Sequence, residues 1–128
     1  MKTHKHTHNQ GQTLIEFALL VPILLTISFA IIDLGRVVYF YSAIQNSARE
    51  GARFGIIEPF QTWEIENRVR SSAAGLDQSV LQVQTTWPDD AVRVHVQYTF
   101  RALTPVLPSL LGYDQLQLNA YATMFVEK

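Results

Sequence analysis

The sequence contains no cysteine, and its charged residues are few and nearly balanced in sign. The absence of cysteine excludes disulfide bonds, thiolate metal sites and cysteine nucleophiles, and it is compatible with either redox compartment. Because 10 basic residues stand against 11 acidic ones, the chain has no overall basic field that would attract nucleic acid. We therefore expect no nucleic-acid partner.

Motifs for catalysis are also missing. The sequence has no nucleophile elbow, phosphate-binding loop or paired-histidine zinc motif. Glu64 and Glu66 are two residues apart in a predicted helix, so their carboxylates point to different sides and do not form an acid and base pair. His95 has no metal-binding companion near it in the sequence. We expect no enzyme activity, cofactor, metal or small-molecule substrate.

Charge is almost absent between residues 14 and 32, LIEFALLVPILLTISFAII, where Glu16 is the only charged side chain. A helix of this length rises about 28 Å, close to the roughly 30 Å thickness of a bilayer's hydrocarbon core. Lys2 and Lys5 precede it, which favours a cytoplasmic N-terminus. The sequence predicts one span, at about 14–32, in contact with the lipid of the cytoplasmic membrane and followed by an extracytoplasmic domain.

A cleaved secretory signal is the competing interpretation of this segment. Lys2 and Lys5 resemble a basic n-region, and Ser28-Phe29-Ala30 resembles a cleavage site. However, the apolar run is longer than a usual signal core and carries a carboxylate, and the helical pattern continues beyond it. These features favour a membrane span.

Glu16 lies inside the apolar segment, where a charged side chain is costly unless it finds a partner. Gly11 precedes it, so that Gln12 is the first and Glu16 the fifth residue after that glycine. Here the chain resembles the type IV prepilin class, in which a prepilin peptidase cuts after a glycine and glutamate stands at the fifth mature position. The resemblance implies a cytoplasmic leader of residues 1–11, cleavage between Gly11 and Gln12, and pairing of Glu16 with the N-terminal amine of a neighbouring subunit.

Two further features of the long helix are candidates for a role in assembly. Pro22 lies within the span and leaves the Ala18 carbonyl without its usual donor, so we expect a bend that helps subunits to pack. Asp33 and Arg36 are three residues apart on one helical face at the outer boundary. We expect a local ion pair there, worth roughly a few tenths of a kcal/mol.

A stripe of small side chains follows the span along one face of the helix. Its members recur every four residues and are Ala43, Ser47, Gly51 and Gly55, in line with Tyr39. Such a stripe lets another backbone approach closely. The alternative is that small residues merely fill the helix near its end, with Gly55 as its C-terminal cap. A glycine inside a helix costs about 1 kcal/mol relative to alanine. This cost favours the interpretation that the stripe packs closely against another segment.

The longer pattern, EFALLVPILL and then IIDLGRVVYFYSAIQNSAREGARFG, closely resembles the TadE-like family of tight-adherence (Flp, type IV) pilus systems. The resemblance covers residues 11–57, its most specific part is A-R-E-G-A-R, and Asp33 stands where many relatives carry glutamate. It implies a minor pilin or pseudopilin of an adhesive pilus, with prepilin peptidase, other pilins and a pilus assembly platform as partners. The alternative is a membrane-anchored binding module of a secretion or envelope complex that enters no filament.

The pattern predicts an α+β fold, in which a pilin-like helix over 12–57 is followed by an extracytoplasmic domain over 58–128. A second, shorter helix is predicted at 62–74, with Trp63, Ile65, Val69 and Ala73 toward its apolar side. Three antiparallel strands are predicted from alternating apolar residues at 81–87, 92–100 and 116–126, the first two forming a hairpin.

Two apolar features of the domain have no obvious place in this scheme. The stretch 102–114, ALTPVLPSLLGYD, is too long and too apolar for a simple turn, so we expect it to pack on the helix, touch lipid or contact a neighbour. Tyr121 and Phe125 fall on the polar side of the last strand, where either a partner or the helix would cover them.

Overall fold

The computed structural model describes residues 8–126 and confirms the α+β class. In chain order the elements are α1 (His8–Ile57), α2 (Thr62–Ser72), β1 (Leu81–Thr86), β2 (Ala91–Arg101), α3 (Val106–Leu111) and β3 (Gln115–Phe125). Residues 1–7 of the expected leader lie outside the described residues, and residues 8–11 belong to α1. The predicted long helix, short helix and three strands are all present, and α3 is an addition within the apolar stretch 102–114.

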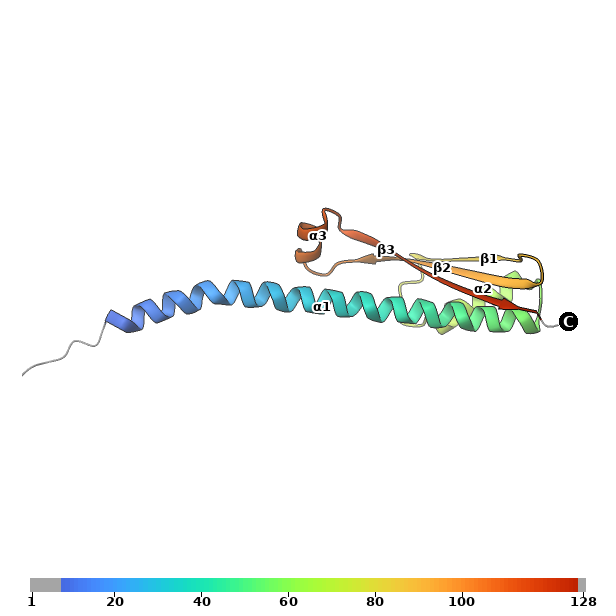
Figure 1. The fold of residues 1–128 in the computed structure, drawn as a ribbon, viewed down its shortest axis with the longest axis horizontal. Coiled ribbons are helices and arrows are strands. Elements are labelled where there is room, and N and C mark those ends of the chain that lie inside the picture. The colour runs from blue at the N-terminus through green and yellow to red at the C-terminus, as the bar shows by residue number, and fades with distance from the viewer. Residues whose placement is uncertain (1–7, 127–128) are drawn as a thin grey trace, which may run out of the picture.

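Helix α1 runs along the whole molecule, and the other elements lie beside its C-terminal half (Figure 1). Its N-terminal half carries exposed apolar side chains, and the other described residues bury none of its most apolar window. The C-terminal half packs against α2, β2 and β3. One helix therefore serves two environments, a bare apolar half and a half that belongs to the domain.

The three strands form one antiparallel sheet in the order β1-β2-β3, as the alternation predicted. Leu81 faces Tyr98 across the first pair of strands, and Val92 faces Met124 across the second. Along β2 the buried residues alternate with more exposed ones from Val92 to Phe100. This alternation turns one face of the sheet toward the helices and leaves the other face open.

The core lies between α1, α2 and the inner face of the sheet. Its fully buried members include Ile44 and Ala52 from α1, Val69 from α2, and Val94 from β2. Because α1 contributes directly to this core, the domain boundary placed between residues 57 and 58 follows the end of a helix but divides the packing unit. The segment after residue 57 depends on α1 for one wall of its core.

The exposure of three side chains answers what the sequence pattern left open. Trp63 is 70% exposed, so its predicted place on the buried side of the second helix is wrong. Two residues turn a helix by about 200°, which puts Trp63 on the face opposite Ile65. Tyr121 and Phe125 are 57% and 76% exposed because both helices pack on the other face of the sheet, so the helix does not cover them.

Candidate functional site

The predicted processing segment is an exposed part of α1 near its start. Gly11, Gln12 and Glu16 are all exposed, and Gln12 Nε2 donates a hydrogen bond to Glu16 Oε1 at 3.2 Å. Residues four apart share one helical face, so a new amine at Gln12 would emerge on the same side as the Glu16 carboxylate. Gly11 lies in the first turn, where backbone N–H groups have no partner within the helix, and a helix opens most easily there.

The apolar half of α1 has the properties of a membrane span. Within residues 8–126, α1 is the one helix that is long and apolar enough to cross a bilayer, and none of its most apolar window is buried in the protein. Leu14 is 68% exposed and Ile31 is 64% exposed. A core helix of a soluble protein would bury these side chains, so their exposure is compatible with membrane anchoring.

Pro22 does not interrupt α1, which continues as a helix on both sides of it. The helix follows a gentle curve through this region rather than a sharp kink (Figure 1). The hydroxyl of Thr26 donates to the Pro22 carbonyl and that of Ser28 donates to the Leu24 carbonyl, each at 2.8 Å. Both hydroxyls are thus satisfied within the helix, as an apolar environment requires.

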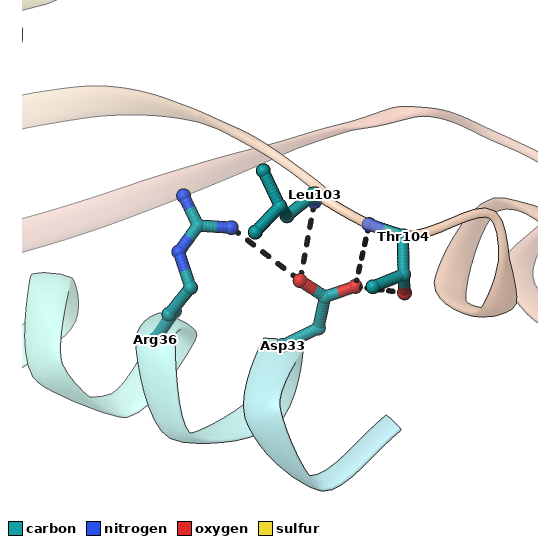
Figure 2. A network of polar contacts seen from close by, with 4 residues as sticks. All are labelled: Asp33, Arg36, Leu103 and Thr104. Carbon is teal, nitrogen blue, oxygen red and sulfur yellow. Dashed lines mark hydrogen bonds and ion pairs between the residues drawn. The ribbon is translucent and has the colours of Figure 1, made fainter. Parts of the chain in front are cut away.

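Asp33 ends the apolar half and ties the C-terminal domain to it (Figure 2). Its side chain is 0% exposed. Oδ1 accepts the Leu103 N–H at 3.1 Å, and Oδ2 accepts the Thr104 N–H at 3.2 Å and the Thr104 hydroxyl at 2.5 Å. Arg36 Nη1 lies 3.4 Å from Oδ1. The buried carboxylate thereby joins two segments that are about 70 residues apart in the chain. We call Asp33, Arg36, Leu103 and Thr104 the Asp33 junction.

Arg36 completes the junction by contacting aromatic rings as well as the carboxylate. Its guanidinium carbon lies 5.4 Å from the centre of the Phe40 ring and 5.0 Å from that of Phe100, within the range of cation–π attraction. Burial alone would raise the pKa of Asp33, but the hydrogen bonds from Thr104, Leu103 and Arg36 together hold that pKa below its ordinary value. The carboxyl is therefore ionised at neutral pH.

The sequence placed Asp33 beside Arg36 but did not indicate that residues 103 and 104 would join them. The sequence did contain one indication that Asp33 has further hydrogen-bond partners. A carboxylate has about four acceptor sites, and a single arginine three residues away satisfies only part of them. An aspartate at the end of an apolar run therefore calls for further donors, although the sequence does not say which segment supplies them.

The small-residue stripe contacts this chain's own domain. A Cβ atom on Gly51 would overlap with Val69 Cγ2 of α2, and one on Gly55 would come within 2.9 Å of Val92 Cγ2 of β2. Ser47 is buried and donates its hydroxyl to the Ile44 carbonyl, whereas Ala43 is half-buried. Gly55 is not a helix cap, since α1 continues to Ile57. The side chains that approach Gly51 and Gly55 belong to α2 and β2, so both glycines are covered within the chain.

The side chains that could ligate a metal are dispersed in the part of the chain that the structure describes. Among residues 8–126, no three histidine, aspartate or glutamate side chains are placed to hold a metal ion. His95 stacks on Tyr121 with 4.2 Å between ring centres, and its Nε2 lies 3.0 Å from Asn119 Oδ1. This is an ordinary cross-strand arrangement on the open face of the sheet. The candidate functional residues that the structure brings together lie along α1 and at the Asp33 junction.

Comparison with known proteins gives one match. Residues 11–53 fit the family model described as TadE-like protein. No curated protein and no solved structure matches the chain with significance. The matched range begins at the glycine of the expected cleavage site, includes the apolar half of α1 and Asp33, and ends within the small-residue stripe. Residues 11–53 are thus similar to the TadE-like family, as the sequence resemblance predicted, and this similarity suggests a protein associated with tight-adherence pili.

Proposed function

We propose that this chain is a minor pilin or pseudopilin of a tight-adherence pilus. Residues 14–32 anchor it in the cytoplasmic membrane with the N-terminus inside, prepilin peptidase removes residues 1–11, and the mature helix then joins other pilins at the assembly platform. The chain either enters the filament or primes its formation. Its role is structural, and it uses no cofactor or small-molecule substrate.

The division of α1 into two halves carries this proposal. Its bare half presents apolar side chains and Glu16 to the surroundings, and its other half forms one wall of the domain core. A subunit that leaves the bilayer to join a filament needs an apolar surface that can exchange lipid for neighbouring helices. The TadE-like match over residues 11–53 supports the same assignment.

Glu16 has a chemical role in this scheme. Its carboxylate is exposed in the single chain and accepts a hydrogen bond from the neutral amide of Gln12. In lipid or in a filament interior, an ionised carboxylate needs a cation nearby. Cleavage after Gly11 creates an amine at Gln12, and the same group on a neighbouring subunit would neutralise Glu16.

Processing is tested by the mass of the intact protein. When the full chain is expressed with its cognate prepilin peptidase, we expect loss of residues 1–11 and a mature N-terminus at Gln12. A chain expressed without the peptidase serves as the control and should keep its full mass. Retention of the leader in the presence of an active peptidase would overturn the processing step.

Assembly is tested by Glu16→Ala. We expect the variant to insert into the membrane normally while recovery of sheared pili falls strongly, because loss of one partner from a buried ion pair costs about 3–5 kcal/mol. Glu58→Ala is a matched control, since Glu58 is an exposed acid of the same chain beyond the end of α1. Normal piliation by Glu16→Ala would contradict the filament role.

The alternative function, a membrane-anchored binding module that enters no filament, has one structural feature in its favour. Large apolar side chains are exposed at the end of the domain far from the span, among them Phe60 at 77% and Phe125 at 76%. Such residues favour contact with another protein. Unchanged piliation by Glu16→Ala, together with loss of a bound envelope protein on changing Phe60 and Phe125, would support this alternative.

A further inference from the structure

The loop that binds Asp33 continues into an uncharged, exposed segment. From Ala102 to Tyr113 the sequence ALTPVLPSLLGY contains no ionisable side chain except the tyrosine phenol, and Arg101 and Asp114 flank it on either side. Its large apolar side chains are among the most exposed of the domain: Leu103 is 73%, Leu110 74%, Leu111 47% and Tyr113 58% exposed. We call residues 102–113 the apolar loop.

The place of the apolar loop is fixed relative to the span. Leu103 and Thr104 donate hydrogen bonds to Asp33, the residue that follows the last apolar position of the span at Ile32. After Thr104 the chain passes into α3 on the side of Asp33 that faces away from Arg36, which is the side toward the span (Figure 2). Figure 1 shows α3 as the part of the domain that extends furthest along α1 toward its N-terminus.

One side of the apolar loop packs against the rest of the protein, and the other side is exposed. Leu107 packs against the edge of the core, and α3 contacts α1. Leu110, Leu111 and Tyr113 remain exposed, as do Ile31 and Ile32 of the span immediately before Asp33. The exposed surface of the loop therefore continues the apolar surface of the helix at the height where the helix leaves the hydrocarbon.

We propose that the apolar loop inserts into the outer-leaflet interface of the membrane while the protein is anchored there. The exposed side of the loop then contacts bilayer lipid, at the boundary between the headgroups and the acyl chains. The lack of charge removes the main cost of this insertion, and Tyr113 has the amphipathic ring that is enriched at membrane interfaces. The proposal rests on residues 14–32 spanning the membrane, which is part of the proposed function.

This contact gives the anchored protein a second attachment besides its span. The Asp33 junction holds the loop against the helix, so the domain lies close to the bilayer instead of turning freely above it. Extraction of α1 into a filament then also requires Leu110 and its neighbours to leave lipid. The apolar loop thereby distinguishes the anchored state from the assembled state.

The absence of cysteine allows single-site labelling of the full chain. Leu110→Cys and Phe125→Cys place an environment-sensitive fluorophore at two sites of similar exposure, 74% and 76%, at opposite ends of the domain. Phe17→Cys places it within the span. Each labelled protein is reconstituted in phosphatidylcholine vesicles, with or without lipids that carry a nitroxide quencher on the upper acyl chain or deeper in the bilayer.

At position 110 we expect blue-shifted emission that the shallow quencher weakens. At position 125 we expect the emission of a fluorophore in water, without quenching. At position 17 we expect the deep quencher to be the more effective one. Aqueous emission at 110 together with quenching at 17 would overturn the loop insertion and leave the span intact. A blue shift at 110 that is unquenched and disappears on dilution in lipid would show a protein neighbour and would also overturn it. Absence of quenching at 17 would overturn the span and the loop insertion together.

Discussion

Replacing Asp33 with alanine is expected to destabilise the domain by about 2–4 kcal/mol, the largest effect of any single substitution at the Asp33 junction. The change removes the acceptor of the Leu103 and Thr104 N–H groups, and a hydrogen bond to a charged group contributes about 1.5–3 kcal/mol. It also leaves the guanidinium of Arg36 without its carboxylate. Urea unfolding in micelles, followed by the fluorescence of the two tryptophans, measures the loss.

Asp33→Asn is the matched control because it keeps the size of the side chain and one acceptor oxygen. We expect it to lose roughly half as much stability as Asp33→Ala, since hydrogen bonds to a charged acceptor are about twice as strong as those to a neutral one. Amide hydrogen exchange at Leu103 and Thr104 should accelerate in both variants. Unchanged exchange at these two amides in Asp33→Ala would show that the carboxylate does not hold the loop.

Replacing Gly51 with alanine is expected to destabilise the domain by up to about 2 kcal/mol, although alanine is the better helix former. Alanine in place of glycine gains about 1 kcal/mol of helix propensity. Its Cβ atom, however, would overlap with Val69 Cγ2, and overpacking of a core costs about 1–3 kcal/mol or more. Val69 is β-branched and fully buried, so it has little freedom to move away.

The same helix offers a control substitution that should change the stability in the opposite direction. A Cβ atom on Gly35 would meet nothing within 4 Å, so Gly35→Ala should stabilise the protein by up to about 1 kcal/mol. The change in stability for Gly55→Ala should lie between those of the other two variants. Its Cβ atom would have its nearest contacts at 2.9 and 3.1 Å, and the second of these is with the terminal methyl group of Ile65. Unfolding midpoints of the three variants give the order directly. A stabilised Gly51→Ala would refute the close packing of α1 against α2.

Much of the fold could be predicted because its elements have clear periodicities. The apolar run and the small-residue stripe indicated one long helix, and alternation at Val92, Val94 and Val96 indicated a strand with one buried face. The hairpin followed from the short turn between two such strands. These features depend on local geometry, which a sequence pattern records directly.

The contacts between distant segments could not be predicted in the same way. The stripe at Gly51 and Gly55 indicates that something packs closely there, but the same residues suit a neighbouring subunit or the chain's own α2 equally well. Asp33 needs donors, yet nothing local identifies the backbone of Leu103 and Thr104. The predicted position of Trp63 is wrong because the hydrophobicity of tryptophan suggests burial, whereas its angular position on the helix turns it toward solvent.

The sharing of α1 between the span and the domain has a mechanical consequence. No flexible linker separates residues 14–32 from the core residues Ile44, Ala48 and Ala52, so a force that draws the helix along its axis acts on the domain at once. The Asp33 junction lies where this load would shear the sheet past the helix. Tension applied along the helix would therefore reach the domain through the core contacts of α1 and through the Asp33 junction.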